Sequence, residues 1–125
     1  MLQAKDIMTS RLMLVNRRAT LVAAASRMRD EKIGILPVVD RGHLVGMITD
    51  RDLAVRAMAE GLDPRLTMVE AIMTPKVVSC SEEEPIEDLP FLMKRHGVHR
   101  LVVINEKGKP VGIISIEDLE KHDLH

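Results

Sequence analysis

The first half of the chain shows a short apolar run, a helical stripe and then two further apolar runs. The stripe places apolar side chains at i, i+3, i+4 and i+7, the period of a helix with one buried face, and Thr20 before it is a favourable N-cap. The last two runs flank a short loop that contains Gly42, which is the signal for a β-hairpin. The predicted elements are a strand at 12–15, a helix with the stripe Leu21, Ala24, Ala25 and Met28, a hairpin of residues 36–40 and 44–49, and a closing helix from Asp50 to about Glu60.

The second half repeats this order of elements. Pro85 stands at the tolerated start of the predicted helix, whereas Pro90 lies inside that helix and should kink or loosen it. Gly97 is placed to end the helix, and a Gly-containing loop again joins two apolar runs into a hairpin. The predicted elements are a short helix at 67–72, a strand at 76–79, a helix with the stripe Ile86, Leu89 and Met93, a hairpin of residues 101–105 and 110–115, and a closing helix from Glu117.

The two halves are copies of one another. Residues 6–9 (DIMT) reappear as residues 71–74 (AIMT), an offset of 65, and after a one-residue insertion residues 46–53 match residues 112–119. Two copies are too few for a solenoid, so we expect a pair packed about a pseudo-twofold axis. The predicted fold class is α/β in the sense of a mixed α+β architecture, with two β-α-β-β-α repeats at residues 1–64 and 65–125.

Composition excludes several classes of function. The 125 residues carry 18 Lys and Arg against 19 Asp and Glu, so there is no basic footprint for nucleic acid, and the single aromatic residue, Phe91, leaves no stacking platform for bases. The lone Cys80 excludes an internal disulfide and a multi-cysteine metal cage. No apolar stretch approaches the roughly 18 residues of a membrane span, and the N-terminus lacks a signal-peptide pattern, which predicts a cytoplasmic protein without membrane partners.

The repeated motifs resemble those of a tandem pair of cystathionine-β-synthase (CBS) domains, the Bateman module, in stand-alone form. The resemblance covers nearly the whole chain, and each motif gains its weight from recurring twice in the same order. It implies two β-α-β-β-α repeats packed sheet to sheet, two clefts that in this family commonly hold adenosine-containing ligands, and a disc-like dimer that regulates another protein. The residues that carry the resemblance are 7–9 (IMT), 34–40 and 46–53 in the first repeat, and 72–74, 97–103 and 112–119 in the second.

A hydroxyl residue ends each hairpin, and an Asp follows three positions later on the first turn of the closing helix. Because i and i+3 face the same side of a helix, the carboxylate can accept from both ribose hydroxyls, while the hydroxyl and the backbone N–H groups suit a phosphate oxygen. The resemblance assigns these roles to the matching residues. Plain helix capping explains the same spacing and does not exclude ligand binding. The pairs are Thr49 with Asp52 and Ser115 with Asp118.

His99 and Arg100 precede a central strand of the second repeat. They resemble a His-Arg pair that contacts nucleotide phosphates in the regulatory γ subunit of AMP-activated kinase, and a guanidinium fork is well suited to phosphate. The first repeat has Gly34 and Ile35 at the equivalent places, so the two clefts are unequal and the second is the better phosphate site. The alternative for His99 and Arg100 is a solvated surface pair.

Arg51, inside the first hydroxyl-to-Asp motif, is a further phosphate candidate, and the alternative is an ion pair with Asp50 or Glu60 on its own helix. The adenine ring needs an apolar slot with backbone partners. The Ile-Met-Thr turn and the strand after it offer both in each repeat, although the same residues serve equally well as core and hinge. The slot residues are Met8, Thr9 and Met13 in the first repeat, and Met73, Thr74 and Val77 in the second.

We therefore predict a regulatory ligand-binding module rather than an enzyme, because no motif places a Ser-His-Asp triad, a glycine-rich phosphate loop or a metal site. The predicted ligand is an adenine nucleotide, AMP or ADP before ATP, in the clefts between the repeats, and no obligatory cofactor is expected. One alternative is S-adenosylmethionine or another adenosyl ligand. Another is a stress or assembly protein that binds nothing there and acts through dimerisation. The apolar helix from Asp52 to Glu60 suits a homodimer interface, and the regulated protein is not indicated.

Overall fold

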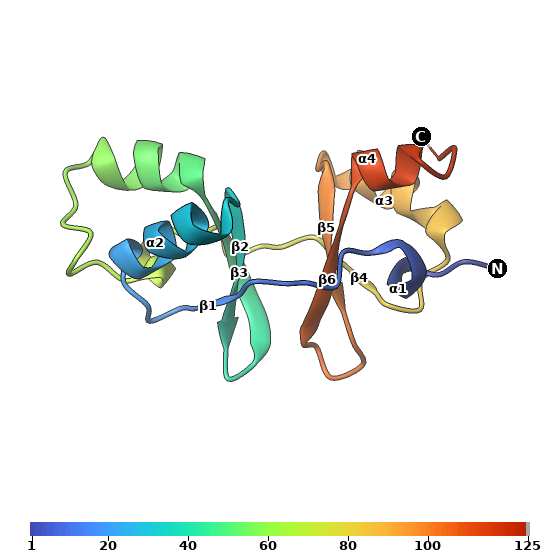
Figure 1. Cartoon of the computed structure of the whole chain (residues 1–125), viewed down its shortest axis with the longest axis horizontal. Coiled ribbons are helices and arrows are strands. Elements are labelled where there is room, and N and C mark those ends of the chain that lie inside the picture. Colours follow the sequence, from blue (N-terminus) through green and yellow to red (C-terminus); the bar gives the residue numbers. More distant parts are fainter. Residues whose placement is uncertain (125) are drawn as a thin grey trace. The chain divides into compact units, whose positions relative to one another are not determined.

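The computed structural model describes residues 1–124, and its strands form two three-stranded sheets, each accompanied by helices (Figure 1). The chain divides into two compact units, one for each sheet. Unit 1 consists of residues 1–12 and the chain from Val78 onward, and unit 2 is the continuous segment Met13–Val77. The mixed α+β fold with two related β-hairpin units, predicted from the repeats, is confirmed.

Unit 2 contains a parallel strand pair joined to an antiparallel hairpin, in the sheet order β1-β2-β3. Leu36, Val38 and Ile48 of the hairpin are fully buried, and the stripe of α2 packs on them through Leu21 and Ala24. Burying a side chain such as Leu contributes roughly 1.5–3 kcal/mol, so this face holds the unit together. The elements are β1 (Val15–Asn16), α2 (Leu21–Glu31), β2 (Ile35–Asp40), β3 (His43–Thr49), the π-helix η1 (Asp52–Met58) and the 3-10 helix η2 (Val69–Ala71).

Unit 1 has the same order of elements and the sheet order β4-β5-β6. The predicted stripe Ile86, Leu89 and Met93 is buried, and it packs on Leu101 and Ile114 of the hairpin. The elements are α1 (Ala4–Ile7), β4 (Ser79–Ser81), the 3-10 helix η3 (Ile86–Asp88), α3 (Leu89–His96), β5 (Arg100–Ile104), β6 (Pro110–Ser115) and α4 (Ile116–Glu120).

Several element boundaries differ from the predicted ones. The expectation that Pro90 disrupts the interior of a helix is wrong: a 3-10 turn comes first, and Pro90 falls in the first turn of α3, where no backbone N–H is needed. Gly97 ends α3 in the left-handed conformation, with φ of 64°, as predicted. The first strand of each repeat begins about three residues after its predicted start. The closing helix of unit 2 is a π-helix over Asp52–Met58.

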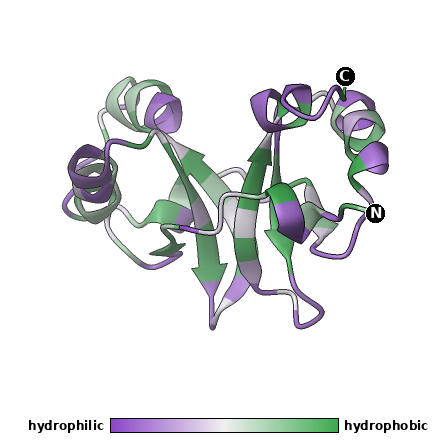
Figure 2. Cartoon of the chain, turned by 45° about the vertical axis from the view of Figure 1, so that its right-hand side comes forward, coloured by the Kyte–Doolittle hydropathy of each residue, from purple (hydrophilic) through white to green (hydrophobic). Residues whose placement is uncertain are grey.

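The hairpin of unit 2 turns in two residues. Arg41 and Gly42 have φ of 52° and 82°, and positive φ at both positions is the requirement of the tight turn that matches strand twist. In unit 1 the longer turn is held by Asn105, whose side-chain oxygen accepts the N–H groups of Lys107 and Lys109. Figure 2, coloured by hydropathy, shows that the strands are mostly apolar and that the tips of the hairpins are polar.

The Ile-Met-Thr segments do not dock on the hairpin of their own repeat. Thr9 exchanges backbone hydrogen bonds of 2.9 and 3.1 Å with Ile113 of β6, in unit 1. Thr74 makes the equivalent bonds of 2.8 and 2.9 Å with Met47 of β3, in unit 2. Each segment therefore extends the sheet whose hairpin comes from the other repeat, and the compact units divide the chain at 12/13 and 77/78 while the sequence repeats divide it at 64/65.

The N-terminus of α2 is closed by the loop that follows η1. Thr20 accepts the Ala23 N–H at 3.1 Å, as its predicted N-cap role requires. The N–H groups of Leu21 and Val22 donate to the carbonyls of Thr67 and Pro64, at 3.0 and 3.1 Å. The loop therefore supplies the acceptors that the first turn of a helix otherwise lacks.

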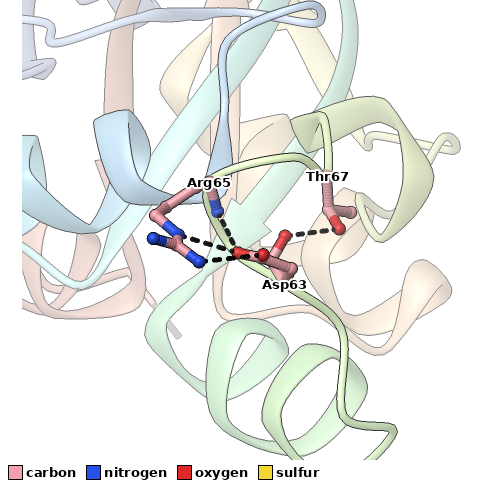
Figure 3. A network of polar contacts seen from close by, with 3 residues as sticks. All are labelled: Asp63, Arg65 and Thr67. Atoms are coloured by element: carbon pink, nitrogen blue, oxygen red, sulfur yellow. Dashed lines mark hydrogen bonds and ion pairs between the residues drawn. The ribbon is translucent and has the colours of Figure 1, made fainter.

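Asp63 gives that loop its shape (Figure 3). One carboxylate oxygen accepts the Arg65 backbone N–H at 3.0 Å and Nε at 3.3 Å, the other accepts Nη2 at 3.3 Å, and the Thr67 hydroxyl donates to the Asp63 carbonyl at 2.8 Å. The hydrogen bonds from Arg65 hold the pKa of Asp63 below its usual value, and the side-chain bonds have a larger effect than the backbone N–H. One short network thus fixes the carbonyls that receive α2.

Candidate functional site

The hydroxyl and the Asp of each predicted motif are bonded to one another. In unit 2 the Asp52 N–H donates to Thr49 Oγ1 at 3.1 Å, and the Thr49 N–H donates to Asp52 Oδ2 at 2.9 Å. In unit 1 the matching bonds between Ser115 and Asp118 are 3.2 and 2.9 Å. Each pair is a reciprocal capping box, so the capping alternative is realised in both units. Each box uses only Oδ2, and within residues 1–124 the Oδ1 of each half-buried carboxylate accepts no hydrogen bond.

Arg100 lies beside the capping box of unit 1. Its Cα is directly opposite that of Ser115 across β5 and β6. The side chain is exposed, and among the described residues it forms no ion pair. An unpaired guanidinium next to a hydroxyl and a carboxylate is a combination that can hold both phosphate and ribose.

His99 has a different neighbourhood from Arg100. Its side chain lines a groove between α3 and α4, together with Phe91, Lys94 and Ile116. Its carbonyl accepts the Ile116 N–H at 2.9 Å and so fixes the start of α4. The structure therefore brings Arg100, Ser115 and Asp118 together and places His99 on the helix side of the strand.

In unit 2 the place of Arg100 is taken by Ile35, which is opposite Thr49 across β2 and β3. The predicted phosphate-binding cation of unit 2 is Arg51. This residue is exposed, and its backbone N–H donates to Asp50 Oδ1 at 2.8 Å. The described chain shows no ion pair between the Arg51 side chain and Asp50 or Glu60, so that alternative is not realised.

The predicted adenine-slot residues are divided between the units by the exchanged segments. Met8 and Thr9 lie along β6, two positions before Ser115, and Met73 and Thr74 lie along β3, two positions before Thr49. Met13 packs against the core of unit 2 and so is not grouped with Met8 and Thr9. Val77 is a half-buried residue at the end of unit 2.

Gly46 and Gly112, which open the matched segments 46–53 and 112–119, lie under the Ile-Met-Thr segments. A methyl group on Gly46 would lie 2.6 Å from Met73 Sδ and 2.9 Å from the Thr74 carbonyl oxygen. On Gly112 it would lie 2.8 Å from Met8 Cγ and 3.0 Å from the Thr9 oxygen. A glycine at the same strand position of both repeats could therefore have indicated that another segment of the chain passes close to the strand there.

Each unit carries an apolar groove between two of its helices. The groove between α3 and α4 has a volume of about 800 Å³, and the one between α2 and η1 about 420 Å³. Two exposed apolar side chains line these grooves, Phe91 at 68% and Met58 at 77%, and Val55 of η1 is also exposed, at 52%. These surfaces suit protein contact better than a small polar ligand.

Other chemistry is sparse in the described chain. Within residues 1–124 no group of three or more His, Cys, Asp and Glu side chains is arranged to hold a metal ion. In the same range no helix combines the length and apolar character that crossing a bilayer requires. Burial, and secondarily the charge of Glu84, raises the pKa of the Cys80 thiol to about 11, which makes it a poor nucleophile.

Comparison with known proteins identifies the repeats. The CBS domain family matches the chain twice, at residues 4–58 and 69–125. The chain is a member of the CBS-domain family. This CBS-domain pair is 38% identical over 124 residues to the CBS domain-containing protein YhcV of Bacillus subtilis, covering 99% of this chain and 87% of that protein. The pair predicted from the repeated motifs is confirmed.

Two solved structures resemble this CBS-domain pair closely. The crystal structure of Hypoxic Response Protein I with two coordinated zinc ions has a TM-score of 0.85 and 35% identity, covering 98% of this chain and 99% of that one. The CBS domain pair of protein MJ0100, in complex with 5'-methylthioadenosine and S-adenosyl-L-methionine, has a TM-score of 0.81 and 28% identity, covering 98% and 95%.

Proposed function

We propose that this CBS-domain pair is a regulatory module for an adenosyl ligand, and that unit 1 takes an adenine nucleotide, AMP or ADP before ATP. The observation that carries the proposal is the capping box of Ser115 and Asp118 with the unpaired Arg100 opposite it. A structural neighbour that holds two adenosyl compounds supports the ligand class.

In this proposal the free Oδ1 of Asp118 accepts from the ribose hydroxyls, and Arg100 and the Ser115 hydroxyl bind phosphate. Met8 and Thr9 border the adenine through their side chains, because the Thr9 N–H and carbonyl are both paired with Ile113 and the Met8 N–H is paired with the Ala4 carbonyl. His99 contributes through its carbonyl, which fixes the start of α4. Unit 2 offers the corresponding ligand-binding set, which consists of Thr49, Asp52, Arg51, Met73 and Thr74, together with Met13 and Val77 of the same unit.

S-adenosylmethionine or another adenosyl ligand is the second candidate, favoured by the compounds bound to protein MJ0100. Such a ligand would depend little on Arg100. We also propose a homodimer, because the apolar groove of unit 2 is lined by the exposed Met58 and η1 also exposes Val55. The proposed location is the cytoplasm. Ligand occupancy then regulates a partner protein to the extent that the ligand binds one conformation of the module better than another.

Isothermal titration of the ligand-stripped protein with AMP, ADP, ATP, 5'-methylthioadenosine and GMP tests the proposal. We expect AMP to bind and GMP not to bind. Arg100→Ala should weaken AMP by roughly 10- to 150-fold, the value of a charged hydrogen bond of about 1.5–3 kcal/mol, and leave methylthioadenosine unchanged. Asp118→Asn, which keeps an acceptor for the Ser115 N–H, should weaken the binding of both ligands to unit 1.

Two exposed residues of unit 1 provide matched controls. Arg95→Ala removes a cation from the end of α3, and Glu120→Gln removes an anion from the end of α4, so neither should change any affinity. Equal AMP affinity in wild type and Arg100→Ala would contradict the phosphate role. Failure of every adenosyl compound to bind would leave dimerisation and assembly as the function.

A further inference from the structure

One backbone hydrogen bond has an exact counterpart in the other unit and defines equivalent positions. The Asp50 N–H donates to the Gly34 carbonyl at 2.9 Å, and the Ile116 N–H donates to the His99 carbonyl at 2.9 Å. The next residues pair in the same way, Ile35 with Thr49 and Arg100 with Ser115. The two sites can therefore be compared residue by residue at the point where strand, turn and helix meet.

The carboxylate of Asp50 lies directly over Gly34. A methyl group on Gly34 would be 2.7 Å from Oδ2 and 3.1 Å from Cγ of Asp50, so a side chain there would collide with the carboxylate. The other oxygen, Oδ1, accepts the Arg51 backbone N–H at 2.8 Å. The negative charge is thus held at the start of β2, next to Thr49, by a bond on one side and a glycine on the other.

The charged residues at this point are arranged differently in the two units. Unit 1 carries Arg100, Ile116 and Glu117 where unit 2 carries Ile35, Asp50 and Arg51, so the residue directly after the hydroxyl is apolar in unit 1 and a carboxylate in unit 2. In the described residues the Arg51 side chain makes no ion pair with the Asp50 carboxylate, and only the Arg51 backbone N–H is bonded to it. A phosphate beside the Thr49 hydroxyl would meet a fixed like charge, and its access to the Arg51 N–H would be blocked.

We infer that Asp50 determines the specificity of unit 2: it rejects phosphorylated ligands and leaves this site to adenosyl compounds without phosphate, such as thioether or sulfonium nucleosides. The inference rests on the proposed function, since it names the ligand class of one of its two sites. A neutral thioether loses nothing beside the carboxylate, and a sulfonium cation is attracted to it. Like-charge contacts are an established means of excluding the wrong ligand.

The test measures ligand binding to unit 2 alone. In the background Arg100→Ala plus Asp118→Asn, which disables the proposed site of unit 1, AMP and 5'-methylthioadenosine are titrated by calorimetry. We expect methylthioadenosine to bind and AMP to bind at least about tenfold more weakly. Adding Asp50→Asn, which keeps the shape and the acceptor for the Arg51 N–H, should bring AMP to within about threefold of methylthioadenosine and leave the latter unchanged.

Glu60→Gln in the same background is the matched control, because it removes one negative charge beyond the far end of η1 and should leave the AMP affinity unchanged. Gly34→Ala provides a second route, since the added methyl group must displace the carboxylate and should also raise AMP affinity. AMP binding as tightly as methylthioadenosine before Asp50 is changed would overturn the inference but leave the proposed function intact. No binding of either compound to the wild-type protein would overturn both.

Discussion

Gly46 and Gly112 are small because a chain segment passes directly over each of them. The Met side chain and the Thr carbonyl of an Ile-Met-Thr segment fill the space that a Cβ would need. The Met tip can move, but the carbonyl is held by its hydrogen bond to the strand, 2.9 Å long at Met47. Close backbone approach, rather than backbone conformation, therefore requires glycine at these two positions.

Gly46→Ala should lower the free energy of unfolding by about 1–3 kcal/mol, the usual result of overpacking a well-packed contact. Guanidinium denaturation measures the change. Met73→Ala should cost less in the Gly46→Ala background than in wild type, by at least about 0.5 kcal/mol, because the sulfur is then already displaced. Strict additivity of the two substitutions would contradict the contact.

Cys80 offers a clean measurement because it is the only cysteine of the chain. With a pKa of about 11, about one thiol in a thousand is ionised at pH 8, whereas a free thiol of pKa near 8.5 is ionised to roughly a quarter. Labelling with a disulfide reagent at pH 8 should be at least about 100-fold slower in the folded protein than in guanidinium. A difference below tenfold would show that the thiol is not buried in solution.

The raised pKa also has a consequence for stability. Because the folded thiol holds its proton more tightly than the unfolded one, this contribution is fully present below the unfolded pKa. It is lost as the pH rises from about 9 towards 11. Cys80→Ala should remove that part of the alkaline decline.

At the scale of elements, the loop after η1 acts as a cap for α2. Its carbonyls accept the first N–H groups of the helix, and Asp63 holds the loop through Arg65 (Figure 3). This arrangement makes a surface carboxylate matter for a helix that begins 42 residues earlier, at Leu21.

Asp63→Asn should lower the Tm at pH 7, because an amide is a weaker acceptor for the Arg65 guanidinium. The folded pKa of Asp63 is below its unfolded value, so the stabilisation is present above about pH 4 and lost as the pH falls through the folded pKa. The Tm difference between wild type and variant should therefore shrink as the pH falls below about 4. Glu60→Gln, an acid in the turn before the loop, should show no such pH dependence.

Element types followed from the sequence more readily than element ends. The stripes of α2 and α3 and both hairpins are where periodicity placed them, because burial of one face decides the period. Strand ends depend on the partner instead: β4 begins at Ser79 because that residue pairs with Val102 of a strand more than twenty positions away. Pro90 was misread since the 3-10 turn before it, which moves the helix start, leaves no local signal.

The site was predictable to the same extent. The capping boxes could be found because their spacing is local, and both are present. The neighbours of Met8 and Thr9 could not be predicted, because they depend on the pairing of Thr9 with Ile113, about a hundred positions further along the chain. The position of the Asp50 carboxylate over Gly34 could not be predicted for the same reason. It depends on how the start of β2 and the start of the closing helix pack in the folded chain.

For the whole molecule, the exchange of the Ile-Met-Thr segments determines which residues depend on one another. Unit 2 is one continuous stretch of chain, whereas unit 1 is assembled from the N-terminal segment and the second half. Residues 1–12 supply Ala4 and Met8 to the core of unit 1 and a backbone partner for β6. Leu2 also accepts the Ile86 N–H that opens η3, at 3.2 Å.

Deletion of residues 1–12 should therefore destabilise unit 1 selectively, by about 2–4 kcal/mol from the apolar side chains lost. Hydrogen exchange read by mass spectrometry should show faster exchange in α3, β5 and β6, with α2, β2 and β3 unchanged. A synthetic peptide of residues 1–12 should restore protection, and the same peptide carrying Ala4→Asp should not, because Ala4 is fully buried. Loss of protection in α2 and β2, the elements of the same sequence repeat, would instead show that each segment folds with its own repeat.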